Sequence, residues 1–273
     1  ILETLSHQNF TDMRAGHDPG FKFTVGRAVY KAIVRFLHTL HGTPHTIAPL
    51  PVENLAIEFA DGPQPAKKRN KRLKTQTARL SWTPVEDPLE PTATPTGYVV
   101  YTRIGHGGFD NGQYTPVPSF TTPLEPGITY SFKVTAVNDG GESLDSETLA
   151  ACAAPQPGAP VILIVGAFDR LSGPTTIDTE ELQGFDLRSD AGVPYLYSTS
   201  FCGMQQGFEK KNAGIETEGG LGFSGNELEG MKIAGNTFDY PFLHGKAIQA
   251  AGGCSFVSCS DEAVENGRVR LED

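Results

Sequence analysis

The stretch Thr121-Thr-Pro-Leu-Glu-Pro-Gly-Ile-Thr-Tyr-Ser-Phe-Lys-Val-Thr-Ala-Val-Asn-Asp-Gly-Gly-Glu-Ser143 decides the fold of the middle of the chain. Pro126-Gly127 predicts a turn. From Tyr130 onward the side chains alternate, with Tyr130, Phe132, Val134, Ala136 and Asn138 on one side and Ser131, Lys133, Thr135 and Val137 on the other. Aromatic and β-branched residues at period two predict a half-buried strand. Asn138-Asp-Gly-Gly141 ends that strand with residues that tolerate positive φ.

This stretch also carries a family pattern, Leu124-x-Pro126-Gly127-x-x-Tyr130-x-Phe132-x-Val134-x-Ala136-x-Asn138 followed by Gly141-x-Ser143. The pattern resembles the penultimate strand and last turn of a fibronectin type III domain. The resemblance implies a β-sandwich over about residues 50–155, with Tyr130 as the tyrosine-corner residue. Other strands are expected at Val52–Phe59, Ala78–Trp82 and Gly97–Ile104, with the single tryptophan, Trp82, in the core.

The length and composition of the chain limit the classes of protein to which it can belong. A chain of 273 residues can hold one large domain or two to three small ones. Its net charge of −10 argues against nucleic acid as a general partner. No apolar run has the length of a membrane span or the form of a signal peptide. The first residue, Ile1, reads like the middle of a strand, so we expect the chain to begin inside a longer protein.

Four cysteines, Cys152, Cys202, Cys254 and Cys259, are too few for a disulfide scaffold and form no Cys-x-x-Cys pair. Buried thiols are therefore the preferred interpretation. Between the first two expected strands lies the basic segment Lys67–Lys74, which suits either a solvated hairpin loop or contact with an anionic polymer.

Residues 1–45 combine a polar loop, Thr11–Gly20, with an amphipathic helix over about Phe21–His41. Gly42 is expected to stop the helix and Pro44 to prevent its continuation. His38, His41 and His45 near its end suit a metal triad, but imidazoles at a helix C-terminus usually interact with the helix dipole or with water.

The same segment has the order Leu2-Glu3-Thr4, then Ser6-His7-Gln8-Asn9 with Asp12, then Arg27-Ala28-Val29-Tyr30-Lys31-Ala32-Ile33. This order resembles the C-terminal end of the zinc-dependent N-acetylmuramoyl-L-alanine amidases. The resemblance implies that Glu3 handles the proton of a zinc-bound water. The family's zinc ligands lie upstream of this glutamate, so zinc would belong to the full-length protein and this chain alone would be inactive. The alternative is that Glu3 is an ordinary polar residue.

Residues 158–273 predict an α/β domain, complete or truncated. Its expected elements are a strand at Val161–Val165 covered on both faces, a helix at Phe242–Ala251, a strand at Cys254–Cys259, and a helix at Asp261–Asn266 capped by Ser260. The segment between, Thr175–Gly235, is expected to be mostly loop.

In open α/β sheets ligands lie at the carboxyl ends of strands, where this sequence has Asp169 and Cys259. Together with His244 these residues suit a nucleophile (Cys259), a base (His244) and an orienting carboxylate (Asp169). The competing interpretation is that the aspartate caps or turns the backbone and that Cys259 is a buried thiol.

Across the whole chain, the domain order and the stretches Ile233–Lys246 and Ser255–Val264 resemble a group of secreted Bacteroides-type proteins described as xanthan lyases or N-acetylmuramoyl-L-alanine amidases. The resemblance implies export to the periplasm or cell surface and action on peptidoglycan or another polysaccharide. Three functions stay open: part of a cell-wall amidase, a non-catalytic glycan- or wall-binding module, and an independent hydrolase in the C-terminal domain.

Overall fold

The structure, a computed structural model, describes residues 3–60, 76–167, 174–186, 205–207, 232–234 and 239–271. It separates into two compact units, one made of Ile1–Leu37 with Phe168–Phe238 and the other of His38–Ala167 with Asp239–Asp273. This division differs from the three consecutive domains expected from the sequence, 1–45, 50–155 and 158–273. The last residues of the chain belong with the sandwich instead of forming a separate α/β domain.

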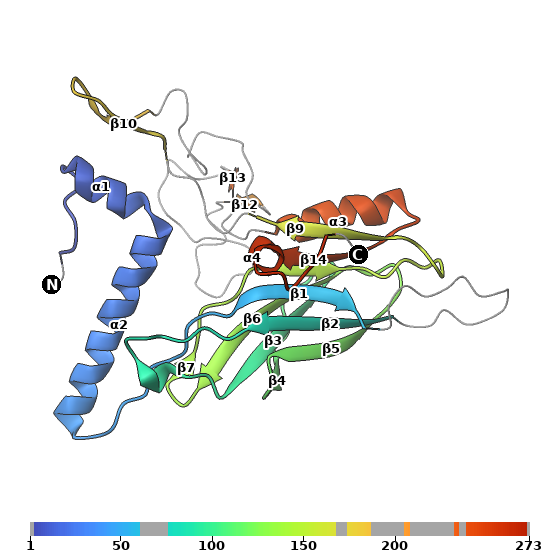
Figure 1. The fold of residues 1–273 in the computed structure, drawn as a ribbon, viewed down its shortest axis with the longest axis horizontal. Helices are drawn as coiled ribbons and strands as arrows, with labels where there is room; N and C mark the ends of the chain where they lie inside the picture. The colour runs from blue at the N-terminus through green and yellow to red at the C-terminus, as the bar shows by residue number, and fades with distance from the viewer. Residues whose placement is uncertain are drawn as a thin grey trace. The chain divides into compact units, whose positions relative to one another are not determined.

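The larger unit is a two-layered β-sandwich (Figure 1). One sheet has the strand order β5-β2-β1-β14-β9, and the other has the order β4-β3-β6-β7 with β8 also paired to β6. The strands of the larger unit are β1 (Glu53–Phe59), β2 (Gln76–Thr83), β3 (Gly97–Ile104), β4 (Gln113–Thr115), β5 (Ser119–Leu124), β6 (Tyr130–Asn138), β7 (Gly141–Glu142), β8 (Leu149–Ala151), β9 (Val161–Gly166) and β14 (Ser255–Ser260). A short 3-10 helix, Pro91–Ala93, precedes β3.

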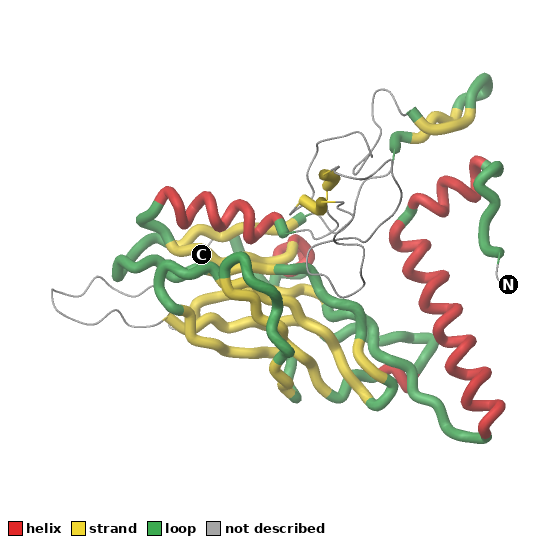
Figure 2. Tube along the Cα trace, turned by 180° about the vertical axis from the view of Figure 1, so that it is seen from behind, coloured by secondary structure: helices red, strands yellow, loops and turns green. Residues whose placement is uncertain are grey.

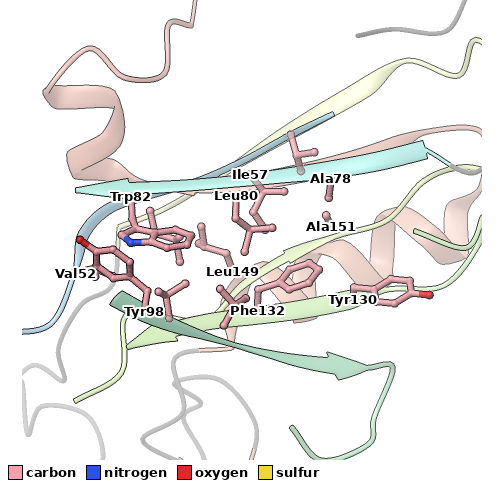
Figure 3. Packing of buried hydrophobic residues seen from close by; sticks show 14 of the residues in the cluster. Val52, Ile57, Ala78, Leu80, Trp82, Tyr98, Tyr130, Phe132, Leu149 and Ala151 are labelled. Carbon is pink, nitrogen blue, oxygen red and sulfur yellow. The ribbon is translucent and has the colours of Figure 1, made fainter. Parts of the chain in front are cut away.

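The hydrophobic core lies between the two sheets (Figure 3). Trp82 is 1% exposed and packs edge-on against the ring of Tyr98, with 5.3 Å between ring centroids. Phe132 and Val134 of β6 are fully buried beside it in the same cluster. The expectation that the single tryptophan fills the core is therefore confirmed.

Strand β6 spans Tyr130–Asn138, as its alternating pattern predicts. The backbone N–H of Glu125 donates a hydrogen bond to the Tyr130 hydroxyl at 3.4 Å, which is the contact expected of a tyrosine corner. One detail differs from the prediction: Ser131 and Thr135, on the other face of the strand, are also buried. The side chain of Arg103 donates to Ser131, and Thr135 donates to Glu142, so the outer face is partly covered.

The C-terminal strands extend the sandwich. β14 pairs antiparallel with β1, and β9 pairs parallel with β14, so both lie in the same sheet as β1 and β2. Strand β8 joins the two layers at this side, because it pairs with β6 while Cys152 just after it bridges to Phe256 of β14. The Ser258 hydroxyl accepts from Ala150 N and donates to Ala150 O, each at 2.8 Å.

Helix α3 (Tyr240–Ala251) packs on the added strands (Figure 2). Gly245 is required here, since a Cβ on it would lie 2.2 Å from the Phe256 ring. Gln249 accepts a hydrogen bond from Thr129 and donates one to the Gly127 carbonyl of the turn before β6. Helix α4 (Asp261–Glu265) follows β14, and the Ser260 hydroxyl accepts from Ala263 N at 3.1 Å, which confirms the predicted cap.

The described part of the smaller unit contains helices and short strands that pair antiparallel. Its elements are α1 (Phe10–His17), most of α2 (Pro19–His41), β10 (Thr176–Asp178), β11 (Gln183–Phe185), β12 (Gln205–Gly207) and β13 (Lys232–Ala234). The sequence correctly predicted α2 and its end at Gly42, which has φ +65°. The prediction of a loop over Thr11–Gly20 is wrong, because Asn9 caps α1 by accepting from Asp12 N at 3.2 Å.

Helix α1 packs against the β10–β11 hairpin. The ring centroids of Phe10 and Phe185 are 5.6 Å apart, and Arg14 pairs with Asp178 at 3.0 Å. Both partners of the ion pair are about half exposed, so the pair adds little stability on its own. The segment Thr175–Gly235 therefore contains short strands as well as the loops that its composition indicated.

Candidate functional site

The predicted nucleophile, Cys259, is fully buried. It packs in an apolar cluster with Ala56 and Ala263, and burial raises the pKa of its thiol to about 11. A thiol with that pKa is almost entirely protonated at neutral pH, whereas the thiolate is the reactive form. This environment suits the buried-thiol interpretation, which Cys152 at 2% exposure also fits.

The other predicted catalytic residues do not assemble around Cys259 in the described part of the chain. His244 lies on α3 with an exposed side chain. Asp169 lies outside the described residues, as do Cys202 and the basic segment Lys67–Lys74. Glu3 is exposed in the loop before α1. The roles assigned to these residues stay predictions.

Zinc has no matching ligand set among the residues that the structure describes. No group of three or more His, Cys, Asp or Glu side chains in those ranges is placed to hold a metal ion. The rings of His38 and His45 are 6.3 Å apart, and His38 Nδ1 lies 2.7 Å from the Thr43 hydroxyl. The predicted histidine triad is therefore not formed in the described residues, and no chemistry through zinc can be derived from them.

The outer face of the β4-β3-β6-β7 sheet carries a different arrangement, centred on Tyr114 of β4. Tyr114 is 61% exposed, yet its ring is held in place. It lies against Gly97, where a Cβ would come within 2.4 Å of the ring, and its hydroxyl donates to the Thr96 carbonyl at 3.3 Å. Tyr114 pairs with Val99, whose neighbours Tyr98 and Val100 face the core, so Tyr114 points away from the core. The other face of the ring is open to solvent.

A row of alternating aromatic and cationic side chains runs along the same sheet face: Phe242, Arg103, Phe109, Lys133 and Tyr101, which we call the aromatic–cation row. The Arg103 guanidinium lies 4.8 Å from the Phe242 ring and 5.0 Å from the Phe109 ring. Lys133 Nζ lies 5.0 Å from the Phe109 ring and 5.3 Å from the Tyr101 ring. Such cation–π contacts stabilise the rings in fixed positions.

Each of the two cations in the row also forms an ion pair with a carboxylate. Arg103 pairs with Asp239, the residue before α3, at 2.9 Å, and both side chains are more than nine-tenths buried. Lys133 pairs with the partly exposed Asp145. The row therefore has a buried end, which fixes α3 to the sheet, and a half-buried end at Tyr101 and Lys133.

Tyr101 belongs to a hydrogen-bonded group at this half-buried end. Its hydroxyl and that of Thr135 both donate to Glu142 Oε1, each at 2.5 Å. The hydrogen bond to Glu142 and partial burial raise the pKa of Tyr101 to about 12. Tyr101 thus stays a neutral donor at neutral pH, and Glu142, which accepts both hydrogen bonds, is an exposed residue.

This face was not predicted from the sequence. Two glycines were the available signal: Gly97, which lies under Tyr114, and Gly112, which has φ +77° and whose Cβ would meet Val99 and Tyr101. Glycine next to an outward aromatic residue permits a ring to lie flat on the backbone. The sequence pattern alone does not pair these residues across strands.

These observations define the class of protein as a β-sandwich with an exposed aromatic and polar sheet face. A fibronectin type III domain model matches residues 63–151. That range holds β2 to β8, so this part of the chain is a fibronectin type III sandwich, as its sequence indicated.

Solved structures that align with part of this chain include the twitchin kinase region of C. elegans, with 20% identity over 40% of this chain and 17% of that chain and a TM-score of 0.31. A human fourth fibronectin type III domain aligns with 21% identity over 41% of this chain and 84% of that chain, with a TM-score of 0.31. Titin kinase with its flanking domains aligns with 19% identity over 38% of this chain and 16% of that chain, with a TM-score of 0.28. The chain thus spans about a sixth of the twitchin and titin chains that it matches.

Membrane insertion through a helix has no support in the described ranges, where every helix is too short or too polar to cross a bilayer.

Proposed function

We propose that this chain is a non-catalytic, glycan-binding part of a secreted protein that acts on cell wall or polysaccharide. The observation that carries the proposal is the exposed, immobilised Tyr114 ring on the sheet that also carries the hydrogen-bonding groups of Tyr101 and Glu142. A sugar ring has one face of C–H groups and a rim of hydroxyls, so it needs an aromatic plane together with polar side chains at its edge.

The dimensions of the face favour a linear polymer. Neighbouring strands are about 4.8 Å apart, so the distance from β4 across β3 and β6 to β7 is about 14 Å. Tyr114 lies at one end of this line, opposite Val99, which in turn pairs with Thr135. Glu142 pairs with Val137, and its side chain reaches the other end of the line by accepting a hydrogen bond from the Thr135 hydroxyl. A short run of sugar rings can therefore lie across the strands, stacked on Tyr114 and hydrogen-bonded to Glu142.

Preorganisation supports binding on this surface. Tyr114 is fixed by Gly97 and Thr96, and Tyr101 is fixed by Glu142 and by Lys133. Side chains that are already ordered lose little conformational entropy when a ligand binds. Lys133 and Arg103 are both paired with carboxylates, so neither cation of the aromatic–cation row is free to bind an anionic polymer. A glycan without a dense negative charge is the ligand that fits best.

The test is sedimentation of the purified chain with insoluble peptidoglycan and with a panel of insoluble neutral polysaccharides. We expect the wild-type chain to sediment with at least one of them. Tyr114→Ala should weaken binding about tenfold, which corresponds to about 1.4 kcal/mol for a central aromatic contact. Leu89→Ala is the matched control, because Leu89 is 80% exposed and lies outside β3, β4, β6 and β7.

Two results would count against the proposal: a wild-type chain that binds no glycan, or a Tyr114→Ala chain that binds as well as Leu89→Ala. Binding should also survive Glu3→Ala and Cys259→Ala, since neither residue lies on this face.

The amidase-like alternative rests on the sequence resemblance of residues 1–45. In that alternative Glu3 serves a zinc site whose ligands lie upstream, and zinc belongs to the full-length protein. The metal content of this chain, measured by mass spectrometry together with peptidoglycan release, tests it. We expect no stoichiometric zinc and no release, whereas zinc with release that Glu3→Ala abolishes would favour the amidase. Release abolished by Cys259→Ala would favour the third alternative, a hydrolase in the C-terminal segment.

A further inference from the structure

Strand β9 has an unusual composition for its position. All five residues Val161–Val165 are apolar, which is typical of an interior strand of a parallel sheet covered on both faces. Among the described strands, however, β9 is the last in its sheet. Val161, Ile162 and Val165 are 38–39% exposed in the described structure, so the predicted burial on both faces is not observed.

The backbone of β9 is open along one side in the described part of the chain. Ser255 N donates to the Pro160 carbonyl, and β9 pairs with β14 in parallel register. In a parallel ladder alternate residues bond the same neighbour, so Ile162 and Ile164 also direct their peptide groups to β14. The N–H and C=O groups of Val161, Leu163 and Val165 point to the other side. These unpaired peptide groups can form backbone hydrogen bonds with another β-strand.

Charge and proline, two of the features that usually protect an edge strand, are absent from β9. No charged residue occurs from Pro155 to Ala167, and the strand itself contains no proline. Edge strands that avoid association carry lysine, proline or a bulge. The edge is also complementary to itself, since antiparallel pairing of two copies places uncharged apolar residues opposite one another.

We propose that β9 pairs antiparallel with β9 of a second copy of this chain, which joins the two five-stranded sheets into one. The two-fold axis passes through the Leu163 pair, so Val161 of each copy lies opposite Val165 of the other. Each of these residue pairs exchanges two backbone hydrogen bonds. The interface is isologous, as expected for a closed homodimer.

The first test is sedimentation equilibrium of the whole chain over a range of concentrations. We expect a reversible monomer–dimer equilibrium, and Val165→Lys should raise the dimer Kd at least tenfold. Val117→Lys is the matched control, because Val117 is also an exposed valine, at 51%, but lies between β4 and β5. The thermal unfolding of each variant shows whether it is folded.

Charge pairing tests the register. The double variant Val161→Glu/Val165→Lys places opposite charges against each other across the two-fold axis, so it should dimerise more tightly than Val165→Lys alone. Amide hydrogen exchange provides an independent readout: the amides of Leu163 and Val165 should become protected as the dimer forms. A wild-type chain that is monomeric at all concentrations overturns the inference, and so does a dimer that Val165→Lys leaves unchanged. Neither outcome affects glycan binding at Tyr114.

Discussion

The ion pair between Arg103 and Asp239 offers a sharp test of how the C-terminal segment is attached to the sandwich. The pair is 2.9 Å long, and its side chains are 9% and 3% exposed. Asp239→Ala leaves the Arg103 charge buried without its carboxylate, which costs about 3–5 kcal/mol. Asp239 makes no side-chain capping bond to α3, so no helix cap is lost with it.

Trp82 provides the assay, because it is the single tryptophan and lies in the sandwich core at 1% exposure. Its fluorescence reports sandwich unfolding separately from the smaller unit. For a unit of this size, a loss of 3–5 kcal/mol lowers Tm by about 6–20 °C. Removing both charges in Arg103→Met/Asp239→Leu should restore most of the lost stability, since an apolar replacement of a buried pair is often neutral.

The reasoning is refuted if Asp239→Ala lowers the free energy of unfolding by less than about 1 kcal/mol. That value is typical of an exposed pair and would mean that the segment from Asp239 onward does not bury Arg103. A double variant no more stable than Asp239→Ala would also contradict it, because the loss would then come from packing and not from an unpaired charge.

Three further predictions follow from the geometry. Gly245→Ala should destabilise the sandwich by about 1–3 kcal/mol in urea unfolding, because the new methyl group meets the Phe256 ring. The pKa of Tyr101 is raised from 10.0 to about 12 by its hydrogen bond to Glu142. This hydrogen bond therefore stabilises the fold below pH 10, and the contribution is lost as the pH rises from 10 through 12. In alkaline unfolding, Tyr101→Phe should lose less stability over that pH range than the wild-type chain does. In thiol labelling of the native chain, Cys259 should react only on unfolding, whereas the partly exposed Cys254 should react directly; equal labelling rates would contradict the burial of Cys259.

The sequence predicted the elements of the sandwich well, because each of them has a local signal. The alternation from Tyr130 to Asn138 defined β6, and the run Gly97–Ile104 defined β3. In the same way, the apolar stripe of Phe21–His41 predicted α2. These patterns depend on neighbours in the chain, so they can be recognised without knowing what packs against them.

The arrangement of those elements could not be predicted in the same way. Strand β14 was expected in a separate α/β domain, yet it pairs with β1, about 200 residues earlier in the chain. Nothing in either strand alone specifies that partner. Helix α1 was missed because its residues are mixed and none of them is buried, so that no apolar periodicity marks it.

The candidate binding face illustrates the same limit. Tyr114 and Gly97 lie on different strands, and only their antiparallel pairing brings the ring onto the glycine. Glu142 reaches Tyr101 from β7, across β6. The catalytic hypothesis rested on residues that follow the ends of strands. It could not take into account that Cys259 is buried, because the sequence pattern does not show burial.

The measurement that tests the account most directly is the affinity of the chain for soluble fragments of the bound polymer, compared between wild type and Tyr114→Ala at increasing fragment length. The account predicts that wild-type affinity rises until the fragment covers the roughly 14 Å from β4 to β7, about three sugar units, and then levels off. It predicts that Tyr114→Ala lowers the plateau affinity about tenfold. Equal affinities for both chains, or affinity that does not depend on length, would contradict glycan binding across this face.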